Sequence, residues 1–481
     1  MMDLPERGVG ITFSSAIEPL LDRHPDLIDV VEFEPQTTWL DLGSTTAGRY
    51  QSAEGVNAHI ADLPFPKLVH SIGCPVGGSA DHDRDQIGLL RETIRSLASP
   101  WVSEHLSFNS TGEFSTGFFL PPRQTYAGVE VAADSIRRLR SELGVPLAFE
   151  TGVNYLAPRS DELDDGLFTA AVAEQADAGI LLDLHNVYTN EVNGRQSLTE
   201  FVAQLPLDRV WEVHIAGGFS MDGYWLDAHC GEIPQALLAP AKEIVSQLSN
   251  LKAIIFEIYP AFVKASSTDM LCRQLEFLHE LWAVRPTAAQ AKASYRSAGP
   301  ALPAKSDGAT PSEWEHELGA LVVGAGPGTD LGNELAADSG VALLQKLALE
   351  FRASMISNNL RRTIRLLVLA LGEPVVRMIL RKFRDEVTPQ MFAGREARAF
   401  ADFLKNLNVG VPQLAEVLEF ELAVLDTLLD GRSRVVSFDF DPFPMLLALS
   451  EGRLPDAPSQ DGAYEIEITP DEGAPNIERA V

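Results

Sequence analysis

Eight short apolar runs alternate with amphipathic segments up to about residue 260, and this alternation constrains the fold more than any other feature. The runs are nearly continuous in apolar residues, as expected of strands covered on both faces. They are Val9–Phe13, Ile28–Phe33, Leu68–Ile72, Trp101–Phe108, Leu147–Phe149, Ile180–Leu184, Val210–Ile215 and Ala253–Ile258. A strand followed by a helix, repeated eight times, predicts a parallel sheet closed into a (β/α)8 TIM barrel of class α/β.

The segments between these runs carry the apolar spacing of helices, although those after the second and sixth runs are shorter. The clearest are Ser15–Arg23, Asp85–Leu97, Tyr126–Leu143, Leu167–Ala176, Gln235–Leu248 and Ser266–Trp282. We therefore expect the barrel domain to span residues 1–285. A chain of 481 residues is too long for one ordinary core, so a second domain is expected.

The remaining third of the chain changes character twice. Residues 286–337 are rich in Ala, Pro, Ser and Gly, which is typical of a linker. Helical spacing returns over residues 338–456 and predicts a smaller, mainly α-helical C-terminal domain that ends with a strand, and residues 457–481 read as an acidic tail. Basic residues gather on these helices, where we expect a solvated face or, alternatively, a docking surface for an acidic peptide.

The charge of the chain argues against a general nucleic-acid binder. Acidic residues number 68 against 38 Lys and Arg, a net charge of −30, and such a surface repels phosphate backbones. No apolar run reaches the ~18 residues of a membrane span. The three cysteines form no CxxC pattern and the first residues show no secretion signal, so we expect a cytoplasmic location with no membrane attachment.

Polar side chains stand at the ends of six consecutive runs, where barrel enzymes place their active sites. Asp227 and His229 form an Asp-x-His segment whose alternate side chains point the same way. We expect all of these groups to meet at one mouth of the barrel. They are His70, Glu104, His105, Glu150, Asp183, His214, Asp227, His229 and Glu257.

This set mixes imidazoles with carboxylates and contains no Arg or Lys to balance the acids. Because unpaired buried carboxylates are costly, we expect cations among them. Mixed His and carboxylate ligation suits zinc, manganese or non-haem iron, and one metal takes roughly four to six ligands. The set therefore predicts two or three metals without identifying the element.

Two chemistries fit such a site. Redox-inert metals would activate water or polarise a sugar carbonyl, as in the xylose isomerase and endonuclease IV group of hydrolases and isomerases. Iron would leave positions open for O2 and run an oxidation. A non-enzymatic metal-binding scaffold is a third interpretation.

The order of the motifs narrows this choice. Together, over about residues 7–283, they resemble the multinuclear non-haem iron-dependent oxidases (DUF692), the family of the methanobactin biosynthesis oxidase. The motifs are HSIG, SEHLSF, a strand ending in Glu150, LLDLHNVY with a downstream VNG, VHIAGG, DAH and a last strand with Glu257.

The resemblance implies two or three irons of mixed Fe(II)/Fe(III) valence and O2-dependent modification of cysteine in a ribosomally made precursor peptide. It also implies a partner protein that presents the peptide, and we expect the C-terminal domain to act as such a recognition module in cis. The resemblance assigns the catalytic role to His70, His105, Glu150, Asp183 and His214. It assigns metal binding to His70, Glu104, His105, Glu150, Asp183, Asn186, His214, Asp227, His229 and Glu257, with Glu104 either a ligand or a group beside one.

Three residues depart from the family pattern. Thr151 follows Glu150 where the family often has Asn, and His185 precedes Asn186 where the family often has a second Asn. His185 fits either an additional ligand or a donor that orients one. Cys230 fits a small packed residue better than a ligand. These departures bear on the number of metals and the reaction.

Overall fold

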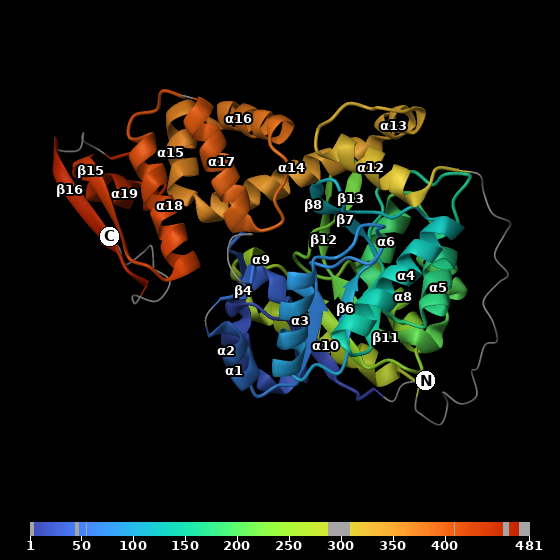
Figure 1. Ribbon diagram of the computed structural model, residues 1–481. Coiled ribbons are helices and arrows are strands. Elements are labelled where there is room, and N and C mark those ends of the chain that lie inside the picture. Colours follow the sequence, from blue (N-terminus) through green and yellow to red (C-terminus); the bar gives the residue numbers. More distant parts are fainter. Residues whose placement is uncertain are drawn as a thin grey trace.

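The computed structural model describes residues 4–43, 48–53, 55–286, 308–407, 409–455 and 461–470. Eight parallel strands close into a barrel in the order β1-β14-β11-β10-β9-β6-β5-β2, which confirms the predicted TIM barrel (Figure 1). The barrel strands are β1 (Gly8–Thr12), β2 (Val30–Phe33), β5 (Lys67–Ser71), β6 (Val102–His105), β9 (Leu147–Glu150), β10 (Gly179–Asp183), β11 (Val210–Ala216) and β14 (Ala253–Glu257).

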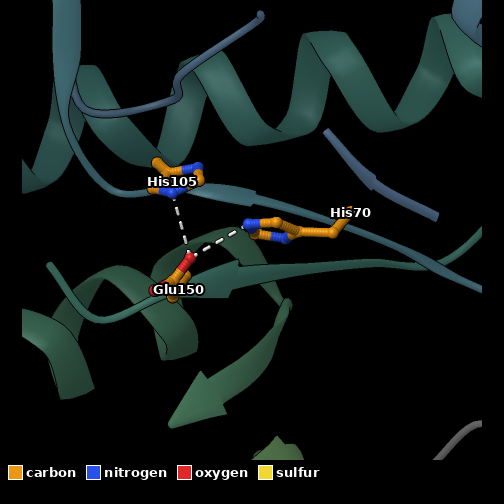
Figure 2. A group of neighbouring side chains, drawn as sticks. All are labelled: His70, His105 and Glu150. Atoms are coloured by element: carbon orange, nitrogen blue, oxygen red, sulfur yellow. Dashed lines mark ion pairs between the residues drawn. The ribbon is translucent and has the colours of Figure 1, made fainter. Parts of the chain in front are cut away.

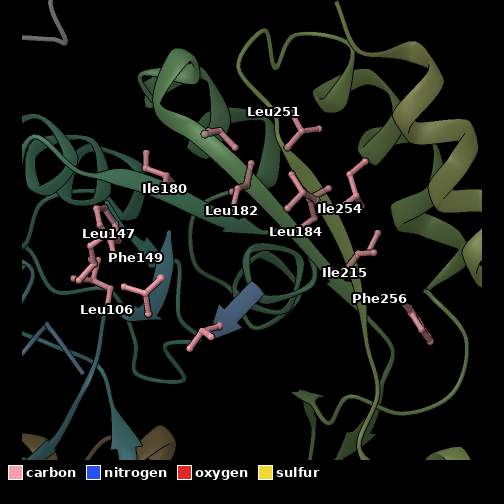
Figure 3. Packing of buried hydrophobic residues seen from close by; sticks show 14 of the residues in the cluster. Leu106, Leu147, Phe149, Ile180, Leu182, Leu184, Ile215, Leu251, Ile254 and Phe256 are labelled. Carbon is pink, nitrogen blue, oxygen red and sulfur yellow. The ribbon is translucent and has the colours of Figure 1, made fainter. Parts of the chain in front are cut away.

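Helices surround the barrel and cover the outward side chains of its strands. Phe149, Leu182 and Ile254 belong to this layer, which Figure 3 shows from close by. Helix ends follow local capping chemistry; for example, the Asp83 carboxylate accepts a hydrogen bond from the backbone N–H of Asp85 at the start of α3. The helices are α1 (Glu18–Arg23), α2 (Val56–Asp62), α3 (Arg84–Ser96), α4 (Tyr126–Leu143), α5 (Asp165–Ala176), α6 (Leu184–Val192), α7 (Leu198–Gln204), α8 (Gln235–Val245), α9 (Pro260–Ala265) and α10 (Thr268–Val284).

Inside the barrel, the inward side chains change from apolar to polar along the barrel axis. Its lower layer is an apolar cluster that includes Val30, Leu68, Trp101, Leu181 and Ile255. Because side chains alternate along a strand, each inward residue lies two positions from the next. The inward positions nearer the carboxyl ends are polar, and this change of composition within the barrel positions the site.

Three two-stranded hairpins rise from the carboxyl ends of the barrel strands. Helix α12 packs on the β7–β8 hairpin, and α14 also contacts β8, so these helices lie over the carboxyl face (Figure 1). The hairpins are β3 (Trp39–Asp41) with β4 (Tyr50–Ser52), β7 (Phe108–Ser110) with β8 (Ser115–Leu120), and β12 (Gly218–Met221) with β13 (Tyr224–Asp227).

The segment expected to be a linker differs from that expectation where the structure describes it. Residues 308–337 contain α12 (Pro311–Val322) and α13 (Asp330–Ala336), and residues 287–307 lie outside the described part. A capping box of Thr310 and Glu313 begins α12, with Pro311 in its first turn. Trp314 is buried, and its indole N–H donates to the Pro121 carbonyl at 3.0 Å. This segment is therefore part of the folded barrel face.

Beyond α14 the chain forms a unit with its own core. Its apolar cluster runs from Ile356 to Ile468 and draws on every element after α14. In Figure 1 the long helix α14 leads from above the barrel into this unit. The elements are α14 (Ser339–Asn359), α15 (Arg361–Leu371), α16 (Glu373–Glu386), α17 (Ala393–Leu407), α18 (Leu414–Asp430), β15 (Arg434–Phe440), α19 (Phe443–Ser450) and β16 (Asp461–Ile468).

The acidic tail also differs from expectation in part. Residues 461–468 form β16, which pairs antiparallel with β15. The alternation of Glu465, Ile466, Glu467 and Ile468 is typical of a strand with one buried face. Residues 456–460 and 471–481 lie outside the described part. Among the described residues, no helix has the length and apolar character to cross a membrane.

Candidate metal centre

Six of the predicted site residues project into the barrel near the carboxyl ends of their strands. Strand pairing places His105 level with Glu150 and Asp183 level with His214. Five of these side chains are at most 3% exposed, whereas His105 is 19% exposed and marks the side that opens to solvent. The six are His70, His105, Glu150, Asp183, His214 and Glu257.

The first cluster joins three neighbouring strands (Figure 2). One carboxylate oxygen of Glu150, Oε2, lies 3.2 Å from His70 Nε2 and 3.2 Å from His105 Nε2. The ring of Phe119 on β8 stacks on the ring of His105, with centroids 4.3 Å apart. Glu150 therefore presents one oxygen to two imidazoles, and an aromatic ring covers one face of His105.

The second cluster shares Glu150 with the first and adds Asp183, His214 and Glu257. One potential ligand atom from each lies within 4.8 Å of the others. His214 Nδ1 is 3.0 Å from Glu257 Oε1. Asp183 Oδ1 accepts from the backbone N–H of Asn186 at 2.8 Å as the N-cap of α6, which leaves Asp183 Oδ2 without a partner.

Asn186 lies at the edge of this cluster. Its Nδ2 donates to Glu150 Oε1 at 3.0 Å and to the Thr151 carbonyl at 3.1 Å, whereas its Oδ1 is buried and has no partner. The amide oxygen is therefore the atom that Asn186 can offer to a cation.

Asp227 and His229 meet Glu257 on the open side of the site. His229 Nε2 lies 3.1 Å from Asp227 Oδ2 and 3.3 Å from Glu257 Oε2. The backbone of His229 has φ of +44°, a left-handed conformation that costs free energy for a residue with a Cβ. The fold holds His229 in this conformation, and the Asp-x-His segment thereby reaches the same mouth as the strand ends.

Glu104, predicted as either a ligand or a group beside one, belongs to none of the ligand groups found among the described residues. It is level with Phe149, so it points out of the barrel while Ser103 and His105 point in. Its Oε2 accepts from Ser71 Oγ at 2.6 Å and from the backbone N–H of Cys74 at 2.7 Å. Its Oε1 accepts from the backbone N–H of His105 at 2.8 Å and lies 3.4 Å from His105 Nδ1. Glu104 therefore holds β6 and the loop after β5 in place.

The structure also defines the surroundings of His185 and Cys230, two departures from the family pattern. His185 Nδ1 lies 2.9 Å from Asp227 Oδ1, and the Trp225 indole N–H donates to His185 Nε2 at 3.1 Å. Both ring nitrogens are thus engaged, so His185 orients Asp227 and has no nitrogen left for a metal. Cys230 belongs to none of the ligand groups found among the described residues, and burial raises the pKa of its thiol.

The set of site residues predicted from the sequence does not contain Glu32, Glu34 or Glu212. The structure places Glu32 and Glu212 with His214 in one group of potential ligands, and Glu34 with His70 and Glu257 in another. The alternation of inward and outward side chains along each strand could have identified them. Glu212 lies two residues before the inward His214, and Glu32 lies two residues after the inward Val30.

Burial and the neighbouring imidazoles shift the pKa values of these acids in opposite directions. Burial raises the pKa of Glu150 to about 8, that of Glu32 to about 8 and that of Asp183 to about 6. Burial also opposes charge on Glu257, but His214 and His229 hold the pKa of Glu257 below its ordinary range. Among the described residues, the cationic side chains paired with these carboxylates are imidazoles alone.

Six buried atoms at the same place make no well-aligned hydrogen bond, although four of them lie 3.0–3.3 Å from an oppositely charged group, and their chemistry tests whether metals would fit. Carboxylate, amide and imidazole atoms are donors that iron, zinc and manganese accept. The donor set of this barrel therefore fits more than one metal. The atoms are Glu150 Oε2, Asp183 Oδ2, Asn186 Oδ1, His214 Nδ1, His229 Nε2 and Glu257 Oε2.

A pocket of about 330 Å³ lies between the barrel loops and residues 388–392, which precede α17. The barrel side comes from the β3–β4 hairpin, the loop after β5 and the β7–β8 hairpin, and the other side from residues 388–392. Tyr50, Phe108, Met391 and Phe392 give it apolar walls. Its polar walls combine hydroxyl and amide groups with the charged side chains Asp41, Arg49, Asp81 and Asp83. Neither half of the molecule forms this pocket alone.

Comparison with known proteins identifies the family. A family profile described as RiPP precursor modification enzyme MbnB/TglH/ChrH matches residues 9–265, more than half of the chain. The chain belongs to this family. Its match ends in α9, so α10 and everything after it lie outside the profile.

Curated relatives carry only a general name. A UPF0276 protein of Streptomyces avermitilis is 27% identical over 230 residues, which cover 46% of this chain and 47% of the relative. A UPF0276 protein of Neisseria meningitidis serogroup C is 35% identical over 188 residues, covering 39% and 64%. The chain thus spans about half the length of the Streptomyces relative, and 84% of a relative from Chromobacterium violaceum that is 24% identical.

Solved structures with a similar barrel are more distant. A 3-keto-D-glucoside 4-epimerase of E. coli has a TM-score of 0.33 at 15% identity, covering 57% of this chain and 98% of the epimerase. A xylose isomerase domain containing protein of Salmonella typhimurium has a TM-score of 0.39 at 13% identity, covering 59% and 99%. Scores this low carry no argument about activity.

Proposed function

We propose that this protein is a multinuclear iron-dependent, O2-using oxidase that modifies cysteine in a ribosomally made precursor peptide. Membership of the precursor-modifying family supports the substrate class. The observation that carries the proposal is the group of carboxylate, amide and imidazole ligand atoms buried together at the barrel mouth, where Asp183 Oδ2 and Asn186 Oδ1 have no partner and the other carboxylates face imidazoles alone among the described residues.

The ligand groups suit more than one cation. His70, His105 and Glu150 would hold one metal, and Glu150, Asp183, His214 and Glu257 a second. Asp227 and His229 would complete a third with Glu257, near the solvent-exposed side. Glu150 and Glu257 each belong to more than one cluster, and shared carboxylates are typical of sites with several metals.

Iron bound at these residues would supply the electron transfer to O2 that side chains alone cannot provide. The chain's own residues prepare the site. His185 holds Asp227, Glu104 holds the strand that carries His105, and Phe119 keeps water from one face of the His105 ring. The open edge at His105, Asp227 and His229 is where a peptide side chain would enter.

The C-terminal region would contribute to peptide binding in cis. Residues 388–392 form one wall of the pocket at the barrel loops, and α12 fixes the loop after β5, because Glu315 accepts from the Ser79 backbone N–H at 2.9 Å. Aromatic, thioether and amide groups stand beside charged side chains in this pocket, and such a mixture suits an extended peptide segment. Met391→Glu should therefore raise KM for the peptide and leave metal content unchanged.

The function is tested with purified full-length protein and a cysteine-containing peptide encoded beside the gene. Iron in the protein, shown by metal analysis and Mössbauer spectroscopy, and O2 uptake that depends on the peptide are expected. Redox-inert metals with hydrolase or isomerase turnover would favour the isomerase-like alternative. Iron without any turnover would favour a scaffold.

The ligand assignment is tested by Asp183→Ala. We expect at least a ~100-fold loss of activity together with loss of bound metal, above the usual effect of residues that act only through a ligand. Asp161→Ala is the matched control, because Asp161 binds Arg123 on the outside of the barrel. Equal metal content in both variants would contradict the assignment.

A further inference from the structure

Three fully buried residues form a polar group one layer below His214 in the barrel. Glu32 is level with Leu68, Glu212 lies two residues before His214, and Trp101 begins the fourth run. Each is 0% exposed. The surrounding layer is otherwise apolar, so acids here need a specific partner.

The contacts run in one direction, from the indole toward the imidazole. The Trp101 N–H donates to Glu212 Oε2 at 2.9 Å, and carboxylate oxygens of Glu212 and Glu32 lie within 4.8 Å of one another and of the His214 ring. Glu32 Oε1 lies 3.0 Å from His214 Nε2, whereas Glu212 Oε1 lies 4.0 Å from the same nitrogen. Glu32 is therefore the group that touches the ring, and Glu212 with Trp101 stands behind it.

His214 faces two different surroundings with its two nitrogens. Nδ1 lies 3.0 Å from Oε1 of Glu257, which shares a ligand group with Glu150 and Asp183, while Nε2 lies 3.0 Å from Oε1 of Glu32. A neutral imidazole carries one N–H, so it can offer one nitrogen to a metal while the other donates a hydrogen bond. A carboxylate behind a ligating imidazole fixes its tautomer and orientation.

We propose that Glu32, held by Glu212 and Trp101, is a positioning residue that keeps the proton of His214 on Nε2 and so presents Nδ1 to the metal cluster. This inference rests on the proposed metal site, but not on which metal fills it or on the reaction. The alternative is that Glu32, Glu212 and His214 bind a cation of their own, since their potential ligand atoms also lie within 4.8 Å of one another.

Two substitutions at the same position separate these roles. Glu32→Gln keeps an oxygen that accepts from Nε2–H, whereas Glu32→Leu keeps the approximate volume and removes the acceptor. Each full-length variant is freed of metal and titrated with Co(II) alone, and bound equivalents, affinity and the NMR signal of the cobalt-shifted imidazole N–H are recorded. Circular dichroism of the metal-free proteins controls for folding.

We expect the same number of Co(II) equivalents in all three proteins. Glu32→Leu should bind Co(II) about 10–100-fold more weakly, and its His214 N–H signal should shift and exchange faster with solvent, while Glu32→Gln should stay within about 10-fold of the wild type. An unchanged affinity and N–H signal in Glu32→Leu would overturn the proposal. Loss of one equivalent in both variants would overturn it in favour of a separate cation site.

Trp101→Phe gives an independent measurement in case Glu32→Leu does not fold. It removes the donor to Glu212 and keeps an aromatic ring in the layer, so the N–H signal of His214 should shift with at most a ~10-fold loss of affinity. An unchanged signal would remove Trp101 and Glu212 from the proposal. A wild-type protein that binds no Co(II) would instead refute the proposed metal site itself.

Discussion

The barrel mouth and the C-terminal unit both bury charged side chains, but they treat them in opposite ways. In the C-terminal unit, the guanidinium of Arg352 binds Glu396, whose other oxygen accepts from the Gln390 backbone N–H at 2.8 Å. Glu421 accepts from the backbone N–H groups of Arg362 and Thr363 at the start of α15, at 2.7 and 2.8 Å. Each buried acid there has a donor from the same unit.

The barrel mouth gathers more acids within a smaller volume and supplies no guanidinium or ammonium group among the described residues. The unit at the other end shows that this chain can pair a buried acid when stability is what is required. The difference supports the proposal that the barrel acids are arranged to hold metal ions.

The basic residues of the C-terminal helices add to the contrast. Arg362 is 1% exposed, and Arg365 donates to the carbonyls of Leu449 and Ser450 at the end of α19. Arg377 pairs with Glu350 and Glu373. These side chains bind other groups of the same unit. They therefore contribute little to the docking surface for an acidic peptide that the sequence suggested.

The largest effect is expected from breaking a pair in the C-terminal unit. Arg352→Met should lower the free energy of unfolding of that unit by about 3–5 kcal/mol, because it leaves Glu396 buried and uncompensated. Urea unfolding followed by a probe in α17 measures this loss. The double variant Arg352→Met with Glu396→Leu should recover much of it, and metal binding should not change. A loss below 1 kcal/mol would show that Glu396 does not depend on Arg352, and would contradict the contrast between the paired acids of the C-terminal unit and those of the barrel.

Metal addition should stabilise the barrel and leave the C-terminal unit unchanged. A metal at about 100 times its Kd should stabilise the folded barrel by about 2.7 kcal/mol. Hydrogen exchange should then slow in β9, β10 and β14, while α17 and α18 exchange as before. Equal slowing in both regions would show that the acids of the barrel are not specifically the metal-binding groups.

A smaller effect is the dependence of stability on pH. Burial raises the pKa of Glu150 and Glu32 to about 8, so the folded, metal-free barrel holds protons that the unfolded chain releases above its ordinary carboxyl pKa. The folded state therefore binds more protons, and metal-free stability should fall as pH rises from about 5 to 8, on the order of 1 kcal/mol per pH unit for each group.

The metal-loaded protein should show the opposite trend over the same range, because a metal replaces those protons and binds more tightly as they leave. Thermal unfolding with and without metal at several pH values measures both slopes. Parallel slopes would contradict the assignment of these carboxyls to the metal.

The barrel and most of its site could be predicted because both depend on local patterns. Continuous apolar runs give the strands, and polar residues at the ends of those runs give the mouth. The alternation of inward and outward side chains would also have pointed to Glu212, and it places Glu104 beside the inward ligands rather than among them. The capping box at Thr310 was a readable signal for α12 within the expected linker.

The partners of His185 could not be read from the sequence. Trp225 and Asp227 lie 40 and 42 residues away, and only the β12–β13 hairpin brings them to its two nitrogens. The boundary between the two cores was equally hidden, because it falls within the continuous helix α14. Its first half packs on the barrel face and its last residues join the C-terminal core.

Two neighbouring residues of β8 face in opposite directions. The Phe119 ring stacks on His105, and the Phe118 ring meets the Phe351 ring of α14 edge to face at a centroid distance of 6.0 Å. Strand β8 therefore contacts the barrel site through Phe119 on one face and helix α14 through Phe118 on the other. Chimaeras that exchange the last third of the chain between relatives should carry the 108–120 hairpin with it, since a graft that separates them would leave a mismatched ring on one side.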